Sequence, residues 1–350
     1  MPATSVHFNG SVNLPDPETV MREISTRIPA GVRRMTEGET GDRNYWIFFQ
    51  QQKFAATAQF EPTPPPQGAT GDYEQIPHLR LAPGVSPSEV VWPDIGYANA
   101  YADSYETFRR LQDEGIIPSG VRFQLEYPTP LAAMSMIDPG DQRSLLDSYE
   151  TALFTDLGQA VNTLAHGEIA VQWDVAVEIG LLAGGFGPAQ PYDAVVPGLT
   201  RCIDQAPDDV PTGMHLCYGD YQHHHFAEPE SLDLQVGLVN ALSASARRPV
   251  SWFSFTVPQD RADDSYFAPL RDLQTGPETE LAFALVPYHP EQQAAGTTTK
   301  QANLIDTHLA HSSGGARDWA ICTECGMGRV ERGDVPRLLD LHREILSASS

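Results

Sequence analysis

Three sulfur- and nitrogen-bearing residues have the types and spacing of a metal centre. His215 and Cys217 are separated by one residue at the end of a β-rich run, residues 213–217. Side chains two positions apart in a strand point to one face, so both can reach the same ion. Imidazole nitrogen and thiolate sulfur are ligands that Zn²⁺ favours, and Cys325 follows another β-rich run. We therefore predict a zinc site formed by His215, Cys217 and Cys325, with a fourth position for a substrate thiol.

Other interpretations of these residues stay open. A cysteine in a strand is often a small core residue. Cys322 and Cys325 have C-x-x-C spacing and could form half of a structural zinc site or a redox dithiol, but the sequence holds no second C-x-x-C pair. The run His223, His224 and His225 could add a ligand, or could be a solvated loop. Cys202 lies in a predicted helix and is expected to be buried.

Eight short β-rich runs, each followed by a helical stretch, must position these residues. The alternation is typical of a parallel sheet wrapped by helices, and eight units predict a closed (β/α)₈ TIM barrel. In such a barrel the active site lies at the carboxyl ends of the strands, where His215 and Cys217 fall. The predicted strands are residues 5–8, 78–81, 121–126, 169–174, 213–217, 250–256, 281–286 and 319–322.

One domain, residues 1–350, is the simplest organisation. Residues 61–71 contain four prolines and two glycines, and we interpret them as a loop because the β/α alternation resumes after them without a new start. Apolar residues recur at helical spacing through residues 144–165, and further helices are predicted at residues 301–311 and 335–346.

The composition excludes several partners. The formal charge is −24, and Lys53 and Lys300 are the only lysines, so a basic nucleic-acid surface is not expected. No apolar run approaches the roughly 20 residues of a membrane span. The first ten residues lack the basic start and apolar stretch of a signal peptide. We predict a cytoplasmic protein with no nucleic-acid or membrane partner and leave homo-oligomerisation open. The pair Arg33 and Arg34, or the pair Arg247 and Arg248, could meet an anionic substrate, but we interpret them as ordinary surface residues.

Several segments, in the right order, resemble the catalytic barrel of cobalamin-independent methionine synthases. Residues 215–220, His-Leu-Cys-Tyr-Gly-Asp, resemble its H-x-C-Y-x-E segment, and residues 324–329, Glu-Cys-Gly-Met-Gly-Arg, resemble its D-C-G-L-x-x-R segment. Asn-Gly-Ser at 9–11, Glu-Gly-Glu at 37–39 and Val-Gln-Trp-Asp at 171–174 resemble the family's I-G-S, H-G-E and V-Q-I-D segments. The resemblance covers nearly the whole chain and implies the same barrel.

The resemblance also implies roles for individual residues. His215, Cys217 and Cys325 match zinc ligands of the family. The residues that match Ser11, Glu39 and Asp174 hold the amino-acid part of homocysteine there, and carboxylates suit an ammonium group. His289 resembles the histidine of a D-I-H segment, a proposed proton donor, and Asp220 stands at the acidic position of the first motif. We predict His289 and Asp220 as catalytic residues.

Some positions depart from the family pattern. The D-E-P motif reads Asp-Val-Ala at residues 174–176, and the strand that brings a zinc-binding glutamate offers Ser254, Phe255 and Thr256. Residues 131–137 lack the aromatic residue that would stack on folate. The sequence therefore predicts three protein ligands for zinc and an alkyl donor other than folate. Glu126, at the end of its predicted strand, has no family counterpart and fits a surface or structural role equally well.

The preferred function is a zinc-dependent thiol alkyl- or methyltransferase that acts on a small-molecule thiol or thioether. One alternative is a non-catalytic or metal-free barrel that binds a small amino acid or thioether. Another is a C–S bond lyase or a coenzyme M-type transferase with the same zinc chemistry. A decarboxylase of the related uroporphyrinogen family ranks third, because it needs arginines at the barrel mouth and Arg122 lies near the start of its strand.

Overall fold

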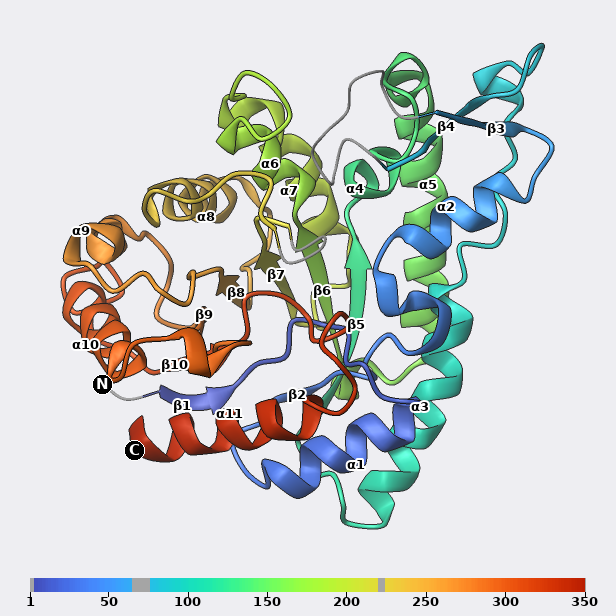
Figure 1. Ribbon diagram of the computed structural model, residues 1–350. Helices are drawn as coiled ribbons and strands as arrows, with labels where there is room; N and C mark the ends of the chain where they lie inside the picture. Colours follow the sequence, from blue (N-terminus) through green and yellow to red (C-terminus); the bar gives the residue numbers. More distant parts are fainter. Residues whose placement is uncertain (1–2, 65–75, 220–223, 350) are drawn as a thin grey trace.

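Eight parallel strands form the central sheet of the protein (Figure 1). The computed structural model describes residues 3–64, 76–219 and 224–349. The strands run in the order β1-β10-β9-β8-β7-β6-β5-β2, and every neighbouring pair is parallel. Their bounds are β1 Ala3–Val6, β2 Arg34–Met35, β5 Arg122–Pro128, β6 Ile169–Val175, β7 Thr212–Leu216, β8 Trp252–Phe255, β9 Glu280–Ala284 and β10 Trp319–Cys322.

The two edges of this sheet meet. A parallel bridge joins Val6 to Val32, just before β2, and the amide of Val6 donates to the carbonyl of Gly31 at 2.9 Å. With helices between successive strands, this closure confirms the predicted (β/α)₈ barrel.

One predicted barrel strand is wrong. His78–Leu81 is β4, which pairs antiparallel with β3, Phe60–Thr63, in a separate two-stranded sheet. The second barrel strand is instead β2, which has two residues and no β-rich run to reveal it. The prediction of a loop at residues 61–71 is wrong for residues 61–63, because these belong to β3.

The helices follow the strands as expected from their caps and apolar faces. In α5 the Asp138 side chain accepts from the amide of Gly140, Pro139 occupies the first turn, and Leu145, Tyr149 and Leu153 are buried. None of the described helices is long and apolar enough to cross a membrane. The helices are α1 Pro17–Arg27, α2 Phe48–Ala55, α3 Tyr97–Asp113, α4 Pro130–Met134, α5 Pro139–Thr163, α6 Val177–Ala183, α7 Val196–Gln205, α8 Asp233–Ser245, α9 Asp264–Phe267, α10 Thr297–Leu309 and α11 Val335–Ser349.

The first and last elements of the chain pack together. β1 pairs with β10, and α11 lies against both α1 and β1 (Figure 1). Inside the barrel, the fully buried indole of Trp252 fills the space beside Gly213, where a Cβ atom would lie 2.0 Å from the ring. A side chain at position 213 would therefore displace the tryptophan that fills this layer of the barrel.

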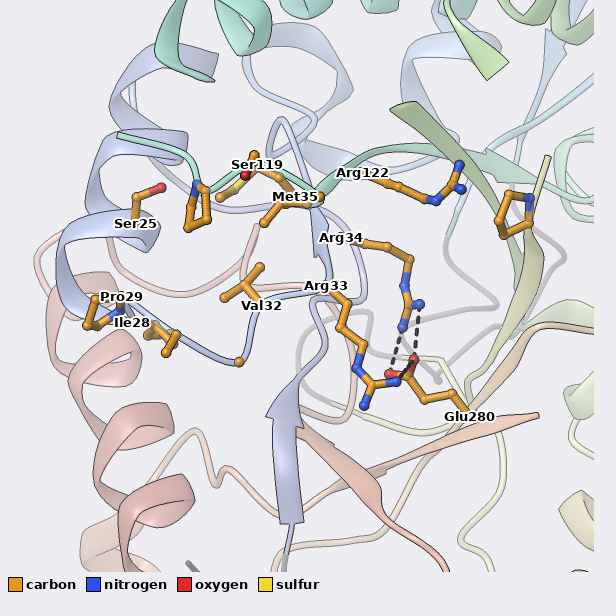
Figure 2. Close-up of a pocket in the computed structure, with 16 residues that line it drawn as sticks. Ser25, Ile28, Pro29, Val32, Arg33, Arg34, Met35, Ser119, Arg122 and Glu280 are labelled. Carbon is orange, nitrogen blue, oxygen red and sulfur yellow. Dashed lines mark hydrogen bonds and ion pairs between the residues drawn. The ribbon is translucent and has the colours of Figure 1, made fainter. Parts of the chain in front are cut away.

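At the amino-terminal ends of the strands, Arg34 contradicts its interpretation as a surface residue. Its buried guanidinium donates to both carboxylate oxygens of Glu280, at 2.8 and 3.1 Å (Figure 2). The same guanidinium lies 4.1 Å above the Trp252 ring. Arg33 is half-exposed and shares the same carboxylate at 3.3 Å. The pocket in Figure 2 surrounds this cluster, in which Arg33 and Arg34 both pair with Glu280. In a barrel of this kind, the amino-terminal ends of the strands serve stability.

Candidate functional site

The predicted metal ligands lie together at the carboxyl ends of the strands. His215 is in β7, Cys217 follows that strand directly, and Cys325 follows β10. One ligand atom from each of the three lies within 4.8 Å of the others. His215 and Cys217 are buried, and Cys325 is partly exposed. The structure thus brings an imidazole and a thiol from the end of β7 together with a second thiol that lies 108 residues after Cys217 in the chain.

Hydrogen bonds to the neighbouring strand β6 and to the segment after β10 fix the His215 imidazole. Its Nδ1 lies 3.3 Å from Oδ1 of Asp174 in β6, and its Nε2 lies 3.1 Å from the carbonyl of Glu324. Gln172 holds Asp174 in turn, by an Nε2 donation of 3.0 Å. Burial by itself lowers the pKa of His215, but the hydrogen bond to Asp174 and the nearby Cys325 raise it above its ordinary value. A carboxylate behind a histidine in this way orients it for a metal.

Separate contacts hold the two thiols. The amide of Gly219 donates to Cys217 Sγ at 3.3 Å, and Arg329 Nη2 lies 3.5 Å from Cys325 Sγ. Tyr288, just after β9, accepts from the Cys325 amide at 3.0 Å and donates to the Cys325 carbonyl at 2.7 Å. N–H donors directed at sulfur favour the thiolate form that binds metals. The sequence did not predict a role for Tyr288, although this residue directly precedes His289, the predicted catalytic residue.

Among the described residues, no fourth His, Cys, Asp or Glu side chain belongs to this group of ligand atoms. Ser254 in β8 lies 3.3 Å from Cys322 Sγ, and Thr256 donates to the carbonyl of Leu216 at 2.8 Å. His225 pairs with Glu228 at 3.1 Å and Glu324 at 3.4 Å, and His224 is exposed. His223 and the predicted catalytic Asp220 lie outside the described residues.

The three residues predicted to bind substrate line the same cavity as the thiols. Ser11, Glu39 and Asp174 border this space of about 890 Å³, together with His215 and both cysteines. Glu39 is 3% exposed, and burial, followed by the nearby carboxylates of Glu126 and Asp174, raises its pKa well above the ordinary value. A cationic group placed beside Glu39 would relieve this repulsion.

Glu126 has a structural environment. The side chain is fully buried, accepts from Gln124 Nε2 at 2.7 Å, and lies 3.1 Å from the Thr36 hydroxyl. Burial and then Asp174 raise its pKa well above the ordinary value. Thr36 also lies 3.0 Å from the Gly10 carbonyl and has one hydrogen to give. A neutral Glu126 can donate to Thr36 while Thr36 donates to Gly10, so the geometry favours the protonated acid.

The structure places His289 away from this cavity. Its side chain is half-exposed, pairs with Glu291 at 3.4 Å, and is not among the residues that line the cavity. Its predicted catalytic role therefore has no support from this arrangement. The cavity instead has aromatic walls that the sequence did not predict, from Trp46, Phe48, Phe186 and Phe226.

The fold and the cavity together define a (β/α)₈ barrel with a His/Cys/Cys cluster at the carboxyl ends of its strands. The sequence matches no known protein-family profile and no curated protein. Among solved structures, the chain is similar in fold to a B12-independent methionine synthase from Shewanella sp. W3-18-1 in complex with selenomethionine. The TM-score is 0.57 with 11% sequence identity, and the match covers 100% of this chain and 97% of that chain. The likeness extends over the whole barrel and concerns the fold.

Proposed function

We propose that the protein is a zinc-dependent enzyme that activates a small thiol and transfers an alkyl group to or from its sulfur. The observation that carries this proposal is the convergence of His215, Cys217 and Cys325 within 4.8 Å, on the wall of a cavity that also holds two carboxylates. The similar fold of a methionine synthase supports the same assignment.

Zinc fits the donor set of this cluster. One imidazole and two thiols are ligands that Zn²⁺ prefers, and three protein ligands leave a position for substrate, as in catalytic zinc sites. When bound, zinc would lower the pKa of a substrate thiol so that the thiolate exists near neutral pH.

The protein's own residues would orient the ligands and the substrate. Asp174 and Gln172 hold the His215 ring, and Tyr288 holds the backbone of Cys325. Glu39 lies in the same cavity and would accept hydrogen bonds from an ammonium group of the thiol substrate. The arrangement suits a thiol that carries an amino group, with Ser11 as a further polar contact.

Two cysteine variants test the proposal. We expect purified protein to contain about one zinc per chain, and Cys217→Ser to lose it, because two protein ligands remain. Cys202→Ser is the matched control, since Cys202 lies buried in α7, away from the cavity lining. In cobalt-substituted protein, homocysteine should shift the visible spectrum as its sulfur binds.

Elemental analysis and absorption spectroscopy distinguish the outcomes. Wild-type protein without stoichiometric zinc, or Cys217→Ser that retains it, would contradict the proposal and favour a metal-free binding protein. A cobalt spectrum unchanged by homocysteine, with metal bound, would restrict the cluster to a structural role.

A further inference from the structure

The cavity has an outer part whose walls are aromatic and aliphatic. Trp46 and Phe48 border it at the start of α2, and Leu131 borders it in α4. Phe186 follows α6 and packs on Phe226, with ring centroids 4.6 Å apart. The His/Cys/Cys cluster lies on the wall of the same cavity, so this one space can hold a ligand against the aromatic rings and a thiol at the cluster.

The local backbone makes room for these rings. A Cβ atom on Gly180 would lie 2.4 Å from the Phe186 ring, and one on Gly185 would lie 2.8 Å from the Phe226 carbonyl. Trp46 has φ of 53°, and Glu39 has φ of 44°. They are the non-glycine residues with positive φ in the described chain, and both line this cavity. Strained backbone of this kind is concentrated at ligand sites.

The charges in the cavity favour a cation. Among the described lining residues the basic ones are His215, His78 and Arg329, and Arg329 lies beside Cys325. Burial lowers the pKa of His78 and outweighs the opposite effect of Asp138, so this side chain is neutral at pH 7. Glu39 and Asp174 add carboxylates, and the whole chain carries −24. An anionic donor, such as one with a carboxylate tail, finds no cationic partner in the described outer part.

We propose that the outer part of the cavity binds an onium compound, a sulfonium or quaternary ammonium ion, and that this compound is the alkyl donor. The inference rests on the proposed function for the identity of the reaction. Aromatic faces attract such cations through their negative quadrupole.

The reaction balances without an added proton donor. A thiolate sulfur forms a bond to the alkyl carbon while the bond from that carbon to the positive sulfur or nitrogen breaks. The electron pair of the broken bond stays on the leaving atom, which departs as a neutral thioether or tertiary amine. The thiol proton passes to solvent when the thiol ionises. This chemistry agrees with the position of His289 outside the cavity lining.

Paired probes test the onium site by isothermal titration calorimetry without added thiol. Choline carries a quaternary ammonium, and 3,3-dimethylbutan-1-ol is its uncharged counterpart of nearly equal shape. We expect choline to bind wild-type protein about 10-fold more tightly than the alcohol. Trp46→Leu and Phe186→Leu should each weaken choline binding about 5-fold and leave alcohol binding little changed. Tyr45→Leu is the matched control, because Tyr45 precedes Trp46, is 56% exposed, and does not line the cavity.

The variants separate ring contacts from the general attraction of an acidic protein for cations. Phe186 is 47% exposed, so its replacement keeps the fold even if Trp46→Leu does not. Equal binding of the two probes, or choline binding unchanged in Phe186→Leu, would overturn the onium site and favour an uncharged apolar donor. Because calorimetry needs neither zinc nor turnover, these results stand apart from the zinc content that tests the proposed function.

Discussion

Asp174 connects the two halves of the candidate site. Its carboxylate lies against the His215 ring on one side and borders the cavity near Glu39 on the other. A bound ammonium group and a bound metal would therefore act on the same carboxylate. In the proposed function, this residue would couple the binding of the thiol substrate to the binding of the metal, whereas the sequence had placed it in the substrate-binding group alone.

Glu126 should give the protein a recognisable pH dependence. Its pKa in the folded protein is raised above the 4.5 of the unfolded chain, by burial first and by Asp174 next. The stability that its protonated form contributes is complete below pH 4.5 and is lost as pH rises through the folded pKa. Glu126→Gln keeps the neutral shape, so we expect its stability gain over wild type to be small at pH 5 and larger at pH 8. Urea unfolding at both pH values measures this difference.

A surface variant provides the comparison for Glu126→Gln. Glu106 lies on the exposed face of α3, and Glu106→Gln should leave the free energy of unfolding within about 0.5 kcal/mol at both pH values. A Glu126→Gln protein that loses stability as pH rises, in parallel with wild type, would show that Glu126 is ionised in the fold.

At the residue scale, the side chains that could be predicted from the sequence are those that belong to short motifs. His215, Cys217 and Cys325 could be found because two lie in one strand and the third sits in a recognisable turn. Trp46 and Phe186 could not, since they lie between elements and reach the cavity only through the path of the folded chain. The Tyr288 hydroxyl contacts the backbone of Cys325, and such a contact cannot be predicted from the residue types.

At the scale of elements, a buried ion pair ties the shortest barrel strand, β2, to β9. The buried Arg34 of β2 binds Glu280 of β9 across the barrel, while Arg33 reaches the same carboxylate from a half-exposed position. Removing one partner of a buried pair leaves an uncompensated charge and costs about 3 kcal/mol or more. We expect Arg34→Gln to lose about this much stability and Arg33→Gln to lose less than about 1 kcal/mol, measured by chemical denaturation. Similar losses in the two variants would contradict this account.

The length of β2 explains why residues 78–81 were wrongly predicted as the second barrel strand. β2 has two residues, so it lacks the alternation or apolar run by which strands are recognised. β4 has such a run, but its partner is β3 in an antiparallel hairpin outside the barrel. Local sequence predicts that a segment is extended, whereas its partner is decided by contacts distant in the chain. The seven other predicted strands overlap the observed strands of the barrel.

At the scale of the whole molecule, we propose that residues 1–350 form one domain and unfold as one unit. The first strand needs β10 as its neighbour, and α11 packs on β1 and α1. Loss of either end would therefore open the barrel. Far-ultraviolet circular dichroism and tryptophan fluorescence should report a single, coincident urea transition. Two separated transitions would indicate independently folding parts.

The pairing of β1 with β10 also has a consequence for how the protein is made. During synthesis β1 emerges 316 residues before its hydrogen-bonding partner, as the pairing of Ala3 with Trp319 shows. Cys325 follows β10, so at about 5–20 residues per second it leaves the ribosome on the order of 10 s after Cys217. Until then the nascent chain presents an open sheet edge and only two of the three clustered side chains, His215 and Cys217. Chaperones can reach the open edge, and metal ions can reach the two side chains. Barrel closure and completion of the His/Cys/Cys cluster thus coincide, so any metal that needs all three side chains would be captured only after β10 has paired with β1.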